Sequence, residues 1–256
     1  MAEQNAAANK QETLWWAKFF VFSSVLSIVI LISGPFGYKY GVTGLVPSLI
    51  SVLVALVGAA LVLLSGFVMT IVAARKGLPR ERNMIVIAMV MSLIPMIFVL
   101  PQMIKAQSVP PIHDISTDTV NPPEFYAILA DRKDAPNDLI YAHEGSAETL
   151  AALQKQAYPQ IMTVTSDLSI AEAVAKSAAI LAEQGHEVVN TDPASGIVEA
   201  TATTFWFGFK DDVVVRASKD GDSTKVDVRS VSRVGQSDIG ANAARIQKFI
   251  DALTSA

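Results

Sequence analysis

Three long apolar runs dominate the first 105 residues, at roughly residues 14–33, 45–73 and 84–104. None of them contains Asp, Glu, Arg or His. Each run is about 20 residues or longer, the length that an α-helix needs to cross about 30 Å of hydrocarbon. Trp15 and Trp16 lie near a run end, where amphipathic rings favour the membrane–water interface. The pattern predicts a membrane domain of three helical spans over residues 1–105, held in a lipid bilayer.

The first run is interpreted as a retained anchor rather than as a cleaved signal peptide. Its basic flank contains only Lys10 and Lys18, and Ser33-Gly34-Pro35 is not a small-x-small cleavage site. We therefore expect all three spans in the mature protein.

A short basic loop between the second and third runs predicts the orientation of the spans. It contains Arg75, Lys76, Arg80 and Arg82, whereas the loop between the first and second runs contains only Lys39. Because loops rich in Lys and Arg stay in the cytoplasm, the N-terminus is expected inside and the chain after the third span outside. The predicted location is the inner (plasma) membrane as a multi-pass protein, with a periplasmic or other extracytoplasmic C-terminal domain.

The composition of the spans argues against transport. Ionisable side chains inside a membrane usually mark ion or proton pathways, and these runs have none in their interiors. Gly58 and Gly66 give the second span a small-residue face for close helix packing. An ordinary three-helix bundle is favoured over a helix that recruits a partner.

A different pattern begins after residue 105. Residues 106–123 include the pairs Pro110-Pro111 and Pro122-Pro123, which predict an extended linker before a soluble domain over residues 124–256. Spacing of apolar positions predicts helices over residues 147–156, 170–184 and 238–253, and strands over residues 186–192, 197–206, 212–218 and 225–231.

Local signals fix how these elements connect. Ser169 and Glu172 form a capping box at a helix start, and Ser237 can cap the last helix. Asp220-Gly221 between two alternating runs indicates a hairpin. Strands joined by tight turns must be antiparallel, so we expect an α+β fold, a two-layer domain of antiparallel sheet covered by helices.

The charge balance changes along the chain. Residues 1–105 contain eight basic and three acidic residues, a balance of +5, and residues 106–256 contain 12 and 21, a balance of −9. An acidic domain argues against nucleic acid as a partner, because phosphates need a basic face. The absence of Cys excludes disulfides, thiolate metal sites and cysteine nucleophiles.

The densest polar region is the predicted strand, glycine turn and helix start over residues 226–245. Backbone donors at a helix N-terminus attract anions, and Arg229 and Arg233 would add positive charge. Asp238 in the first helical turn already complements the dipole and repels a second anion. Structural capping with Arg–Asp pairing is therefore favoured over an anion site.

No catalytic or metal motif stands out. Asp211 and Asp212 are neighbours on a strand and point to opposite faces, so they are poorly placed to share a metal. His113, His143 and His186 are scattered, and the chain lacks a Gly-x-Ser-x-Gly nucleophile elbow. We predict no metal and no cofactor.

The stretches 111–118, 121–123, 158–159, 211–216 and 229–246 resemble the family called domain of unknown function fourteen-ninety-nine, over roughly residues 108–253. Similar domains occur in bacterial envelope proteins and in plastids, some behind membrane spans. The family has no established activity, so the resemblance implies no catalytic role. It implies one polar constellation, made of His113, Asp114, Asp118, Asp211, Asp212, Arg216, Arg229, Arg233, Asp238, Asn242 and Arg245.

These observations favour a membrane-anchored envelope protein whose outward domain binds a partner protein or an amphiphile and performs no chemistry. An apolar ligand could lie between sheet and helices, lined by Phe205, Trp206 and Phe207. The alternative is an envelope hydrolase or small-ligand sensor that uses His113, Asp114 and the arginines. An open pocket joining His113 to Asp211 and Arg233 would favour the alternative, and full pairing under a closed surface would favour architecture.

Overall fold

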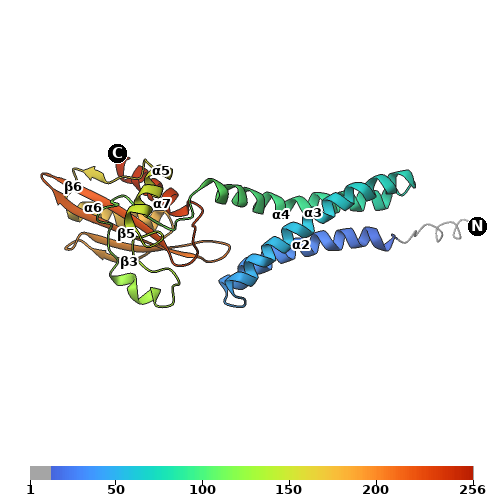
Figure 1. The fold of residues 1–256 in the computed structure, drawn as a ribbon, viewed down its shortest axis with the longest axis horizontal. Helices are drawn as coiled ribbons and strands as arrows, with labels where there is room; N and C mark the ends of the chain where they lie inside the picture. Colours follow the sequence, from blue (N-terminus) through green and yellow to red (C-terminus); the bar gives the residue numbers. More distant parts are fainter. Residues whose placement is uncertain (1–12, 256) are drawn as a thin grey trace, which may run out of the picture. The chain divides into compact units, whose positions relative to one another are not determined.

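Three long helices form the first compact unit of the chain, which extends to Met103 in the computed structural model. The structure describes residues 13–255. The helices are α2 (Trp15–Lys39), α3 (Leu45–Arg75) and α4 (Pro79–Ser108), drawn from blue to green in Figure 1. Each is long and apolar enough to cross a membrane, and each extends past the run that predicted it. The predicted cytoplasmic N-terminus, residues 1–12, lies outside the described residues.

Small side chains let these helices approach closely. A Cβ atom added at Gly58 of α3 would lie 2.8 Å from Ser27 Oγ of α2. One added at Gly66 would lie 2.8 Å from Met89 Cγ of α4. Ala55 and Ala59 on α3 are fully buried. The predicted small-residue face of this helix therefore lies against its neighbours, as expected when packing rather than water exclusion joins helices in lipid.

A six-stranded antiparallel sheet organises the second unit, which begins at Ile104. The strands are β1 (Asp114–Ser116), β2 (Val164–Ser166), β3 (Glu187–Asp192), β4 (Ile197–Thr203), β5 (Lys210–Asp220) and β6 (Ser223–Ser232). Their order is β1-β6-β5-β4-β3, and β2 also pairs with β6. The meander β3 to β6 follows the predicted strands, and its tight turns make it antiparallel (Figure 1).

Helices cover one face of this sheet. They are α5 (Ala147–Ala157), α6 (Ile170–Glu183) and α7 (Ala241–Thr254). The capping box predicted at Ser169 and Glu172 is present at the start of α6. Val213 and Val215 of β5 point into the main core, which also contains Phe249 of α7. The predicted α+β class, with helices over an antiparallel sheet, is confirmed.

The opposite face carries a thinner second layer. It contains the 3₁₀ helix η1 (Ala127–Arg132) and the loops around it. A small apolar cluster forms where Ile128 and Phe125 meet Val214 and Val231 of the sheet. Because side chains alternate along a strand, the same face of β5 presents Asp212 and Arg216, so charged groups flank this cluster.

Three local predictions were wrong. Residues 106–108 of the predicted linker are helical rather than extended, because α4 continues to Ser108, and residues 114–116 belong to the sheet as strand β1. The strand predicted over residues 197–206 ends at Thr203, so Phe205 and Trp206 lie in the turn that follows it rather than in the strand. The last helix begins at Ala241, because Ile239 and Gly240 adopt positive φ angles of 53° and 73° that interrupt helical backbone.

Candidate functional site

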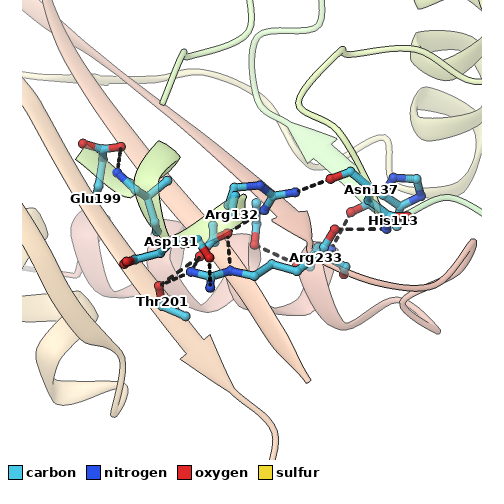
Figure 2. A network of polar contacts seen from close by, with 12 residues as sticks. His113, Asp131, Arg132, Asn137, Glu199, Thr201 and Arg233 are labelled. Atoms are coloured by element: carbon cyan, nitrogen blue, oxygen red, sulfur yellow. Dashed lines mark hydrogen bonds and ion pairs between the residues drawn. The ribbon is translucent and has the colours of Figure 1, made fainter. Parts of the chain in front are cut away.

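The carboxylate of Asp212 lies at the centre of a charged network on the second face of the sheet. Its side chain is fully buried. Arg132 Nη1 donates to Oδ2 at 2.5 Å, and Arg233 donates through Nε to Oδ2 and through Nη2 to Oδ1, both at 2.8 Å. Thr201 Oγ1 donates to Oδ1 at 2.9 Å. Figure 2 shows the Arg233 guanidinium beside Thr201 and the Arg132 guanidinium reaching toward Asn137. Four donor atoms therefore bind the single carboxylate of Asp212.

Backbone carbonyls of the second layer accept hydrogen bonds from both arginines. Arg132 Nη2 donates to the carbonyl of Asn137 at 2.9 Å, and Arg233 Nη1 donates to that of Asp131 at 2.9 Å (Figure 2). The hydrogen bonds that Arg233 donates to Asp212 raise the pKa of the Arg233 guanidinium, which therefore stays charged. The network thus fastens the layer around η1 to strands β5 and β6.

Glu199 performs a similar role on strand β4. Its side chain is fully buried and accepts hydrogen bonds from the backbone N–H groups of Tyr126 and Ala127, both at 2.8 Å. Asn190 Nδ2 donates to it at 3.0 Å. The first backbone donors of a helical segment have no internal partner, so this carboxylate caps η1 from the sheet.

Asp114 and Arg229 form a buried two-point ion pair between β1 and β6. Arg229 Nε lies 3.0 Å from Oδ1 and Nη2 lies 2.6 Å from Oδ2. The guanidinium carbon lies 5.6 Å from the ring centre of Phe125 and 5.7 Å from that of Tyr141. Burial raises the pKa of Asp114 and Arg229 opposes the rise. The two aromatic rings and both carboxylate oxygens of Asp114 thus surround the Arg229 guanidinium and leave it unavailable to a ligand.

Arg216 of strand β5 contacts the second layer at the other end of the same face. Its Nη2 lies 3.2 Å from Asp118 Oδ2 and 3.0 Å from Asp227 Oδ2. Asp227 Oδ1 also accepts from Thr117 Oγ1 at 3.0 Å and from Thr163 Oγ1 at 2.5 Å. This cluster links β5, β6 and the segments before η1 and β2.

The remaining predicted residues lie on the helix-covered face. Asp211 Oδ2 accepts from Arg245 Nη2 at 2.7 Å. Asn242 is fully buried, accepts from Ser230 Oγ at 2.7 Å and also contacts Arg245. Gly240 is the N-cap residue of α7, and Asp238 rather than the expected Ser237 accepts from a backbone N–H of the first turn, that of Asn242 at 2.7 Å. Burial raises the pKa of Asp238.

Comparison with known protein families matches residues 114–253, more than half of the chain, to "Protein of unknown function (DUF1499)". The chain belongs to this family. A comparison with curated proteins finds no match. The resemblance inferred from the residues is therefore confirmed, and three helices able to span a membrane precede the DUF1499 domain. The protein is a membrane protein of unknown activity.

The polar constellation of the DUF1499 domain divides between two faces of the sheet. Asp211 and Asp212 point to opposite faces and bind different arginines. His113 is half-buried, and its backbone carbonyl accepts from Asn242 Nδ2 at 2.9 Å. Arg233 lies on the other face, bound to Asp212. Asn242 and Arg245 thus connect the backbone of His113 to Asp211 on the helix-covered face, whereas Arg233 binds Asp212 on the opposite face.

Sequence reasoning missed three charged members of these networks, Arg132, Glu199 and Asp227. Arg132 lies in the polar segment Asp131-Arg132-Lys133-Asp134, which has no apolar periodicity to indicate a buried position. Glu199 offered a usable signal, because it stands alone between apolar residues in a strand that is otherwise buried. A charged residue at such a position needs partners inside the protein. Asp227 shares that pattern between Val226 and Val228.

The imidazoles do not gather acidic neighbours into a metal site. Among residues 13–255, no group of three or more His, Asp or Glu side chains is arranged to hold a metal ion. His143 lies in a turn opposite Ser146. His186 lies between α6 and β3, in a hollow beside α7.

The basic loop that predicts topology joins α3 to α4. Arg75 ends α3, Lys76 follows it, and Arg80 and Arg82 lie in the first turn of α4. Glu81 in the same turn is buried and accepts from the backbone N–H of Leu14 at 3.4 Å. Its charge also complements the dipole at the start of α4.

Proposed function

We propose that the protein is a membrane-anchored envelope protein whose DUF1499 domain binds a partner protein or an amphiphile and catalyses no reaction. One observation carries this proposal. The buried carboxylates of the polar constellation are saturated by hydrogen bonds and ion pairs from within the domain. The four donors on Asp212 are the clearest case.

Saturated charges favour an architectural role over chemistry. A general acid, base or nucleophile must reach a substrate, and an anion-binding arginine needs unused donors directed at the ligand. Asp114 and Arg229 instead complete each other inside the core. Removing either partner of such a pair would leave an uncompensated buried charge, which is strongly destabilising. These residues therefore act as fasteners between the sheet and its second layer.

The surface of the second layer supplies exposed apolar side chains for binding. Leu129 is 50% exposed and Ile140 is 71% exposed. Tyr126, at 57%, adds an amphipathic ring. Aromatic side chains such as that of Tyr126 are enriched at protein–protein contacts, and exposed apolar neighbours supply surface that a partner can bury. They lie outside the saturated charge network, so a partner could bind there without breaking an ion pair.

The competing function is an envelope hydrolase or small-ligand sensor built on His113 and Asp114. For Asp114 to act as a base or ligand, it would have to leave a two-point pair with Arg229 at 2.6 and 3.0 Å. Ser232 and Asn242 lie beside His113, but both bind its backbone carbonyl. No hydrogen bond described within residues 13–255 joins the His113 imidazole to a serine or threonine hydroxyl. This function therefore ranks second.

We further propose that the domain lies outside the cytoplasm. The supporting feature is the basic loop at residues 75–82, which the positive-inside rule keeps in the cytoplasm. Three spans then carry the chain outward after α4. A fusion of alkaline phosphatase after Ala256 should be active, and a matched fusion at Gly77 should be inactive. The reverse pattern would refute the orientation.

Site-specific photocrosslinking tests the binding proposal. A benzophenone amino acid at Ile140 in the full-length protein should capture a defined protein or lipid in cells, identified by mass spectrometry. The same group at Asp222, in the exposed β5–β6 turn, is the matched control. The same products at both positions, or none at Ile140, would contradict binding through the second layer.

A further inference from the structure

An aromatic turn connects β4 to β5. Between Thr204 and Lys210, four of the five residues are aromatic: Phe205, Trp206, Phe207 and Phe209. Phe205 is 69% exposed and Trp206 is 42% exposed. These exposed apolar rings contrast with the acidic composition of the domain as a whole. Two large adjacent aromatic side chains at the tip of a hairpin are unusual for a surface that meets only water.

The turn is a built structure rather than a loose loop. The N–H of Thr204 donates to the carbonyl of Phe209 at 2.8 Å, and the N–H of Phe209 donates to Thr204 Oγ1 at 2.9 Å. Gly208 has a positive φ of 66°, which lets the chain reverse. The rings of Phe207 and Phe209 stack at 4.8 Å. This base is half-buried, and the more exposed rings extend beyond it.

Strand register places the aromatic turn at the end of the sheet where the chain enters the domain from α4. Thr203 pairs with Lys210 at the base of the turn, and one step along β5, Asp211 pairs with Ser232 at the end of β6. The preceding residue of β6, Val231, pairs with Asp114, the first residue of β1. The starts of β1 and of the aromatic turn therefore share one end of the sheet. The β5–β6 turn lies at the other end.

The tether is short. Nine residues separate Ile104, the last strongly apolar residue of α4, from Asp114. Four of the nine are helical and five are not, so they span at most about 24 Å. The headgroup layer on each side of a bilayer adds about 5–8 Å to the hydrocarbon core. This end of the sheet is thus held within a few nanometres of lipid, at a high effective concentration.

We propose that the aromatic turn docks into the lipid–water interface of the membrane that holds α2, α3 and α4. Phe205 and Trp206 insert among the headgroups and upper acyl chains, where aromatic rings partition favourably. The exposed Lys210 at the base of the turn lies beside lipid phosphates. The tether and the turn then form two attachments at one end of the sheet and orient the domain on the membrane. This proposal holds for either side of the membrane and does not depend on the proposed binding function.

Tryptophan fluorescence of the full-length protein tests this docking directly. Replacing Trp15 and Trp16 with Phe leaves Trp206 as the sole tryptophan. The protein is reconstituted in vesicles of phosphatidylcholine and phosphatidylglycerol, with and without brominated acyl chains. Docking predicts a blue-shifted emission, a marked loss of intensity with brominated lipid, and weak quenching by aqueous iodide.

The matched control moves the probe to the opposite end of the sheet. In the same background, Trp206→Phe with Asp222→Trp places the sole tryptophan in the exposed β5–β6 turn. It should be quenched by iodide and unaffected by brominated lipid. If Trp206 behaves like this control, the turn stays in water and the proposal fails. If Trp206 is shielded from iodide but not quenched by brominated lipid, protein covers it, and the proposal fails as well.

A second variant separates insertion from folding. Phe205→Ser in the sole-Trp206 protein removes half of the exposed aromatic pair and leaves the Phe207–Phe209 stack. Quenching by brominated lipid should fall and quenching by iodide should rise, while the thermal unfolding midpoint stays constant. Unchanged quenching in a folded variant would exclude membrane insertion of the tip.

Discussion

Arg233 and Asp212 form a two-point ion pair across strands β5 and β6, with both N–O distances at 2.8 Å and the carboxylate fully buried. A second guanidinium, that of Arg132, shares the same carboxylate. The pair is therefore unequal. The Asp212 carboxylate is the counterion of two guanidinium groups, whereas Arg233 shares its counterion with Arg132.

This inequality predicts the relative cost of two alanine substitutions. Asp212→Ala should destabilise the soluble domain by about 3–5 kcal/mol, because it leaves Arg132 and Arg233 facing each other without a counterion. Arg233→Ala should cost less, about 1–3 kcal/mol, because Asp212 keeps Arg132 and Thr201 as donors. Urea unfolding followed by fluorescence of a sole Trp206 measures both. Arg233→Ala that folds with unchanged stability but abolishes cellular function would instead indicate a functional site.

A second prediction concerns the cap that Glu199 provides to η1. Glu199→Gln keeps the shape but replaces one acceptor oxygen by a donor group, so the N–H of Tyr126 or Ala127 loses its partner. We expect a loss of about 1–3 kcal/mol. Hydrogen exchange of amides 126–128 should accelerate, while exchange in α6 stays constant.

The matched control for this cap is Glu183→Gln at the exposed end of α6. It carries the same chemical change on a surface helix and should alter neither exchange nor stability. Equal effects of the two substitutions would show that net charge rather than capping sets the stability of η1.

How much of this was accessible from sequence depends on the range of the contacts. Composition alone located the three spans, and the capping box and the Asp220-Gly221 hairpin were visible because each is set by neighbouring residues. Strand alternation also separated Asp211 from Asp212 correctly. These features involve residues within one turn or one strand, where periodicity carries the information.

The second layer of the fold could not be predicted, because its elements have little pattern of their own. β1 and β2 have three residues each, too few for alternation, and they exist because β6 offers partners more than 50 residues away. η1 depends on Glu199, which is 72 residues distant from Ala127. Sequence reasoning placed Asp212 in the polar constellation, but its partner Arg132 lies 80 residues earlier in the second layer, too far along the chain for a local pattern to indicate the pair.

A third prediction concerns pH and His186. Burial lowers the pKa of this imidazole from 6.5 to about 4, with Arg245 and Lys248 adding to the effect. Its Nε2 is buried without a hydrogen-bond partner in the described residues. The folded state resists protonation of His186, whereas the unfolded state binds the proton at the ordinary pKa. The contribution of the neutral imidazole to the free energy of unfolding is therefore fully present above about pH 6.5. It is lost progressively as the pH falls toward 4.

His186→Gln should remove this part of the pH dependence. Thermal midpoints of the two proteins should run parallel above pH 7, and the wild type should fall more steeply between pH 6.5 and pH 4. His143→Gln, in the turn opposite Ser146, is the control and should keep the wild-type slope. Identical slopes for wild type and His186→Gln would contradict a neutral buried imidazole.

The last prediction tests close packing in the membrane unit by enlarging the side chain at Gly58 and shortening the one at Ser27, which it would contact. A Cβ atom at Gly58 would lie 2.8 Å from Ser27 Oγ but 4.0 Å from Ser27 Cβ. Gly58→Ala should therefore push α2 and α3 apart and lower the thermal midpoint in detergent. Adding Ser27→Ala removes the clashing hydroxyl and should restore the midpoint. The single variant Ser27→Ala should have little effect, because its hydroxyl bonds only the Ser23 carbonyl of its own helix. A Gly58→Ala protein as stable as the wild type, or a double variant that is not rescued, would exclude the α2–α3 contact as a determinant of stability.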